Sequence, residues 1–130
     1  MSDNLIKTNS MMKRDRITIN GKIVSITGAN VWMTDYEITE LFGVTSCAVR
    51  SHIKSIFKNG VLSESDTYRY IRLENGNRAD AYNMEMITTL AFRLNSLPAK
   101  IFREWVVRKA VTSPRSAQPI VLQIGSGFPC

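Results

Sequence analysis

The stretch of sequence that decides the fold covers residues 32–58 and reads WMTDYEITELFGVTSCAVRSHIKSIFK. It divides at Gly43 into two short amphipathic segments, of which the first is acidic and the second is basic. Thr34 and Glu37 have the spacing of a capping box, in which each side chain binds the backbone N–H of the other residue. We therefore expect a first helix that starts near Asp35 and stops at the glycine.

The second segment is predicted to be a helix from Thr45 or Ser46, both able N-caps, to about Lys58. A helical wheel separates an apolar stripe from an opposite stripe that contains no acid. The apolar stripe is Val49, Ile53, Ile56 and Phe57, and the opposite one is Cys47, Arg50, Ser51, Lys54 and Lys58. Two helices joined in this way are the layout of a helix-turn-helix.

In a helix-turn-helix the second helix lies in the major groove of DNA, where its side chains meet base edges. The candidate base-reading residues here are Thr45, Ser46, Arg50, Ser51 and Lys54. Arg50 could donate two hydrogen bonds to a guanine, whereas Lys54 and Lys58, a turn or two later, are more suited to contact with phosphates. An ordinary helical hairpin with a solvated, lysine-containing face fits the same pattern, and the sequence leaves this alternative open.

A β-hairpin is predicted before this stretch. Asn20-Gly21 lies between residues 16–19 and 22–26 and favours the positive backbone angles of a type I′ turn. A short strand over residues 31–33 is then expected to lead into the first helix.

A second hairpin is predicted after the basic helix, where a winged helix-turn-helix has its wing. A polar loop at 63–66 precedes an alternating run at 67–73, and Asn75-Gly76 turns the chain back through 78–82. Three arginines of this hairpin could contact DNA: Arg69, Arg72 and Arg78. The alternative is an ordinary hairpin whose arginines pair with Glu74 and Asp80.

Two helices are predicted to complete the domain. Asn83 can cap a helix over residues 84–94, and Ser96, followed by Leu97-Pro98, can open a last helix to about Val111. The last helix carries bases that could contact phosphates or simply face solvent: Lys100, Arg103, Arg108 and Lys109. Together these elements predict an α+β fold, a winged helix-turn-helix-like domain with an N-terminal β-hairpin and two C-terminal helices.

The composition fits one globular domain, because 44% of the 130 residues are hydrophobic and 22% are charged. Residues 1–13 are predicted to be a flexible arm, 14–112 the domain, and 113–130, rich in Pro, Gly and Ser, a weakly ordered tail. The net charge of +6 favours a polyanionic partner without establishing one.

The reactive side chains are too few and too scattered for a catalytic or metal site. Cys47 and Cys130 have no metal-ligand spacing, and His52 is the single histidine, so we expect no enzyme activity, no metal and no cofactor. Neither a signal peptide nor an apolar run of transmembrane length is recognised. We therefore expect a cytoplasmic protein without a membrane partner.

Several blocks of this chain, in their order and spacing, resemble the RhuM family of bacterial and mobile-element proteins. They are residues 31–34, 38–44, 51–57, 82–84, 92–96 and 102–105, within a resemblance that spans roughly 17–111. The last block, Phe-Arg-Glu-Trp, is also similar to phage antirepressor N-terminal domains. The resemblance implies a DNA-binding, virulence-associated protein.

The sequence therefore predicts specific binding of double-stranded DNA by the second helix, with transcription regulation as the outcome. A homodimer is compatible with this function, because one helix reads only a few bases and paired half-sites multiply specificity. The alternative is a protein-interaction module, either an antirepressor or the partner of a toxin, whose basic face would meet an acidic protein surface.

Overall fold

The computed structural model describes residues 13–112, so the predicted tail and, apart from Lys13, the predicted arm lie outside the described residues. Five helices and two small antiparallel sheets make up this α+β part of the chain. In chain order the elements are β1 (Ile17–Asn20), β2 (Ile23–Ile26), β3 (Trp32–Thr34), α2 (Asp35–Phe42), α3 (Ser46–Lys58), α4 (Glu64–Thr67), β4 (Tyr68–Arg72), β5 (Arg78–Asn83), α5 (Met84–Ala91) and α6 (Leu97–Thr112).

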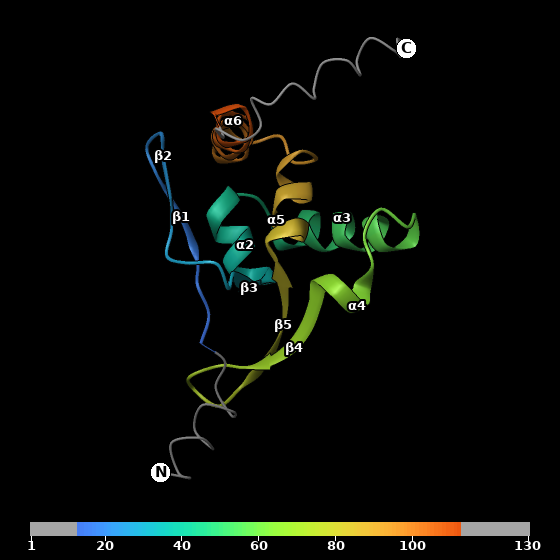
Figure 1. The fold of residues 1–130 in the computed structure, drawn as a ribbon. Helices are drawn as coiled ribbons and strands as arrows, with labels where there is room; N and C mark the ends of the chain where they lie inside the picture. The colour runs from blue at the N-terminus through green and yellow to red at the C-terminus, as the bar shows by residue number, and fades with distance from the viewer. Residues whose placement is uncertain (1–12, 113–130) are drawn as a thin grey trace.

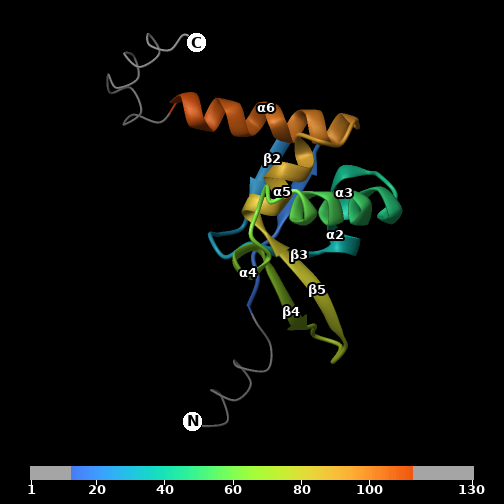
Figure 2. The same ribbon diagram turned by 90° about the vertical axis from the view of Figure 1, so that its right-hand side faces the viewer.

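The helix pair α2–α3 lies in sequence between β3 and β4, which are the two outer strands of the second sheet. β1 and β2 pair with each other, while the second sheet has the order β3-β5-β4, with β5 in the middle. The β4–β5 hairpin projects away from the helices, and α6 lies at the opposite end of the fold (Figures 1 and 2). The hairpin tip is therefore held away from the main helical core.

Local side-chain contacts explain where α2 and α3 begin and end. The hydroxyl of Thr34 accepts from the amide of Glu37 at 3.1 Å, and the Glu37 carboxylate accepts from the amide of Thr34 at 2.9 Å. Gly43 ends α2 with φ +63°, a conformation that favours glycine. The hydroxyl of Thr45 accepts from the Ala48 amide at 3.1 Å and caps α3. The capping box and both predicted helices are confirmed.

The core forms where α2, α3, α5 and α6 bring their apolar stripes together. The rings of Phe42 and Phe102 meet edge to face, with centroids 5.8 Å apart. Ser96 ties α6 to the end of α2, because its hydroxyl donates to the Phe42 carbonyl at 2.7 Å while accepting from the Ala99 amide at 3.3 Å. The largest fully buried apolar side chains are Phe42, Phe102, Ile38, Ile56, Met86, Ile87, Leu90 and Val49.

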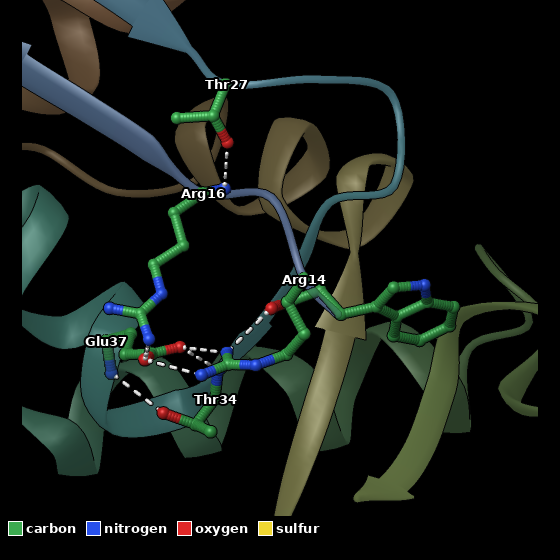
Figure 3. A network of polar contacts seen from close by, with 6 residues as sticks. Arg14, Arg16, Thr27, Thr34 and Glu37 are labelled. Atoms are coloured by element: carbon green, nitrogen blue, oxygen red, sulfur yellow. Dashed lines mark hydrogen bonds and ion pairs between the residues drawn. The ribbon is translucent and has the colours of Figure 1, made fainter. Parts of the chain in front are cut away.

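A polar network attaches the segment before β1 to the start of α2 (Figure 3). The guanidinium of Arg14 donates to both carboxylate oxygens of Glu37, at 2.7 and 3.2 Å, and to the carbonyl of Trp32 at 2.9 Å. The more exposed Arg16 approaches the same carboxylate at 3.5 Å. Burial raises the pKa of Glu37, but the arginines and the Thr34 amide outweigh burial, so its net pKa is lowered.

The first hairpin differs from the predicted one by a single residue. Asn20 pairs with Ile23, so the two loop residues are Gly21 and Lys22 rather than Asn20-Gly21. Gly21 has φ +61°, while none of the non-glycine residues in 13–112 has a positive φ. The predicted type I′ turn is therefore wrong, and glycine at the first loop position matches the type II′ pattern.

Two further boundaries differ from the predicted ones, the first through a local hydrogen bond and the second through a contact from another helix. The predicted polar loop at 63–66 contains the start of α4, and the hydroxyl of the buried Thr67 donates to the Ser63 carbonyl at 2.8 Å. The predicted 84–94 helix ends at Ala91, and Leu94 is still buried. Arg103 of α6 holds the chain there, because its Nη1 donates to the carbonyls of Ala91 and Leu94 at 2.7 and 2.9 Å.

Candidate nucleic-acid interface

The two predicted stripes of α3 are separated in the structure as the sequence indicates. Val49, Ile53 and Ile56 are buried against the core, and Phe57 is half-buried beside them. The opposite stripe is exposed along the whole helix and carries bases, hydroxyls and a free thiol but no carboxylate: Cys47, Arg50, Ser51, Lys54 and Lys58. This face can meet a polyanion without like-charge repulsion from its own helix.

The residues at the start of α3 are less available for contact with DNA bases than the sequence suggested. Thr45 is exposed, but its hydroxyl oxygen already accepts the Ala48 amide as the N-cap. Ser46 is half-buried as the first residue of the helix. The capping role of Thr45 is thus structural, and Arg50, Ser51 and Lys54 remain the more accessible of the predicted base-reading residues.

A cleft of about 300 Å³ separates α3 from the β4–β5 hairpin. Its lining includes Arg50 and Lys54 of α3 and three carboxylates from other elements: Asp35, Glu64 and Asp80. The Nε of Arg50 donates to Asp35 at 3.3 Å, although the arginine side chain stays 65% exposed. The sequence carried no signal that these carboxylates would surround Arg50, because they are scattered over α2, α4 and β5.

Tyrosines of the hairpin complete the cleft. The Tyr68 hydroxyl donates to the Asp80 carboxylate at 2.7 Å, and this bond is the main reason that the pKa of Tyr68 is raised to about 12. Tyr82 lies directly across from Tyr68, with ring centroids 5.7 Å apart, and burial raises its pKa. Both phenols therefore remain neutral hydrogen-bonding groups at physiological pH.

The arginines of the hairpin lie on two different faces. The register pairs Arg72 with Arg78 directly, on the face that carries the cleft tyrosines, and Arg78 stacks over the Tyr70 ring at 5.9 Å. Arg69 is on the other face, over the Trp32 ring at 4.6 Å. Within residues 13–112 none of these three arginines forms an ion pair, so the alternative arrangement, in which they pair with Glu74 and Asp80, is not observed.

The basic residues of α6 form a separate group at the far end of the fold. Arg103 is half-buried and uses its guanidinium on two backbone carbonyls, so its role as a phosphate contact is not supported by its position. Lys109 lies over the Trp105 ring at 5.7 Å. The structure does not bring α6 together with the hairpin tip, as both views show (Figures 1 and 2).

The described part of the chain contains no cluster of three or more metal-ligating side chains. None of the helices between residues 13 and 112 is long and apolar enough to cross a bilayer. Comparison with protein-family models, with curated proteins and with solved structures finds no match for this chain.

Proposed function

We propose that this protein binds specific sequences in duplex DNA by placing α3 in the major groove, and that it is a cytoplasmic regulator of transcription in a bacterial or mobile-element context. The observation that carries the proposal is the exposed, acid-free face of α3 beside a projecting hairpin with two arginines on its α3 side. Membership of the RhuM family is part of the same proposal and rests on the sequence blocks alone.

The arrangement around α3 supports a winged helix-turn-helix interpretation. Helices α2 and α3 lie in sequence between β3 and β4, and β5 pairs with both of those strands. An α-helix with its side chains is about 10–12 Å in diameter and therefore fits a major groove about 12 Å wide, and α3, with 13 residues, is roughly 20 Å long. Arg72 and Arg78 would then contact phosphates beyond the edge of that groove.

The proposal is tested by fluorescence anisotropy on duplexes selected from a random pool, repeated over a salt series. We expect affinity to fall steeply with salt, because bound lysines and arginines release counterions from DNA. Lys58→Ala should weaken all duplexes alike, while Arg50→Ala should reduce the preference for one base position. Lys22→Ala, on the β1–β2 turn away from α3 (Figure 1), is the matched control. Failure to bind any duplex at low salt would refute the proposal.

A second candidate function, a protein-interaction module, is favoured by one apolar surface. A hollow of about 530 Å³ lies at the junction of α5 and α6, where Phe92 and Val107 are 54% and 51% exposed. Large exposed apolar side chains grouped around a hollow are typical of contact sites for other proteins. This function would be favoured over DNA binding if the protein bound no duplex and if Phe92→Ser abolished its binding to a purified partner protein.

A further inference from the structure

The ion pair between α2 and α3 uses the Nε nitrogen of Arg50. Asp35 accepts from Nε, the nitrogen within the side-chain stem, at 3.3 Å. Across residues 13–112 the two terminal nitrogens, Nη1 and Nη2, form no hydrogen bond, and the side chain is 65% exposed. The guanidinium is therefore anchored at its base while its outer end faces solvent beside the proposed DNA-binding face.

The free end of this guanidinium has the chemistry that recognises a guanine. Guanine presents two acceptors, O6 and N7, in the major groove, and an arginine can donate to both at once through its planar fork. A long side chain ordinarily loses rotamer freedom when it makes such a contact. A contact at Nε before binding reduces that loss and favours one direction of the fork.

We propose that Asp35 is a specificity-determining residue that positions Arg50 to donate its two terminal N–H groups to a guanine in the major groove. This inference rests on the proposed DNA-binding function. Asp35 acts through Arg50 and is not itself expected to contact a base.

The position of Asp35 suits this role. It is the first residue of α2, directly after the capping residue Thr34, and its carbonyl accepts from the Thr39 hydroxyl at 2.8 Å. Its backbone is therefore well fixed, and a carboxylate is favoured at a helix N-terminus. Its charge also opposes the approach of phosphates to Arg50, so the aspartate should weaken non-specific binding while it sharpens base preference.

The inference is tested with Asp35→Asn, which removes the charge and keeps the shape. The probes are the duplex that the wild-type protein selects from a random pool, a series in which each G·C pair is replaced in turn, and an unrelated duplex. We expect preference at the Arg50-dependent guanine to fall roughly tenfold, in line with the discrimination that one bidentate contact provides. Affinity for the unrelated duplex should stay equal or rise.

A matched control separates positioning from a general change in charge. Glu64 lines the same cleft but forms no ion pair within the described residues. Glu64→Gln should therefore raise affinity for all duplexes similarly and leave the base preference intact. Asp35→Ser, with a residue that is well tolerated at helix starts, repeats the test if the asparagine variant misfolds by circular dichroism.

A double-mutant cycle decides whether Asp35 acts through Arg50. In an Arg50→Lys background, the Nε donor and the fork are absent, so Asp35→Asn should have no further effect on base preference. The inference is overturned if Asp35→Asn keeps the full preference, or if its effect persists in that background. If the wild-type protein binds duplex DNA with base preference, the proposed function stands even when the inference about Asp35 fails. If the wild-type protein binds no duplex, both the proposed function and the inference are refuted.

Discussion

Replacing Glu37 is expected to reveal that one carboxylate holds the N-terminal segment, β3 and α2 together. Its two oxygens accept from Arg14 and from the Thr34 amide, and the Arg14 side chain is only 9% exposed. Glu37→Ala would leave this guanidinium buried without its counterion and the Thr34 amide without its acceptor. Glu37→Gln would keep the shape and much of the capping box, because glutamine also serves at this position.

The structure sets the size of each effect. Removing one partner of a buried ion pair costs about 3–5 kcal/mol, which we expect for Glu37→Ala. Glu37→Gln loses hydrogen bonds that involve a charged acceptor, at about 1.5–3 kcal/mol. Arg16 is 51% exposed and lies 3.5 Å from the carboxylate, so Arg16→Ala should cost about 0–1 kcal/mol.

Urea unfolding followed by tryptophan fluorescence measures these differences, since Trp32 is buried beside the network. With an m-value of about 2 kcal/mol/M, a loss of 4 kcal/mol lowers the unfolding midpoint by about 2 M. Glu40→Gln, at an exposed site of the same helix, is the control and should change stability by about 0.5 kcal/mol or less.

The same carboxylate makes the stability depend on pH. The folded-state pKa of Glu37 lies below its ordinary value of 4.5, so the ionised form is the one that folding favours. Its contribution is fully present above 4.5 and is lost as the pH falls through the folded-state pKa. Glu37→Gln should reduce this fall of the unfolding free energy at acid pH, which we call the acid limb. A Glu37→Gln variant that is as stable as Glu40→Gln, with an unchanged acid limb, would refute the reasoning.

Three further substitutions test other contacts by the same urea titration. Gly43→Ala should cost about 1–2 kcal/mol, because alanine is strained at φ +63°, and no cost would refute the α2 cap. Ser96→Ala should cost about 1–2 kcal/mol by removing both the bond to the Phe42 carbonyl and the α6 cap, whereas Ser51→Ala on the exposed face should cost far less. Arg103→Met should cost about 1.5–3 kcal/mol through two lost carbonyl contacts while DNA affinity stays unchanged, and a drop in affinity without a loss of stability would contradict the structural role.

The elements around α2 and α3 could be predicted from sequence because their signals are local. The capping box, the glycine at the end of α2 and the 3.6-residue periodicity of the next segment act within a few residues of one another. The same holds for Asn83 at the start of α5 and for the apolar stripes that meet in the core. Short-range hydrogen bonding and periodic burial depend little on the rest of the chain.

Where elements end and which groups meet were decided by the tertiary structure. Arg103 binds carbonyls at the end of α5 from twelve and nine residues away, and the hairpin register places Arg69 on the face opposite Arg72. Carboxylates surround Arg50 only because three separate elements, α2, α4 and β5, converge on one cleft. The sequence thus determined a helix pair with a basic outer face, whereas the orientation of Arg50 depends on a long-range contact that no local pattern encodes.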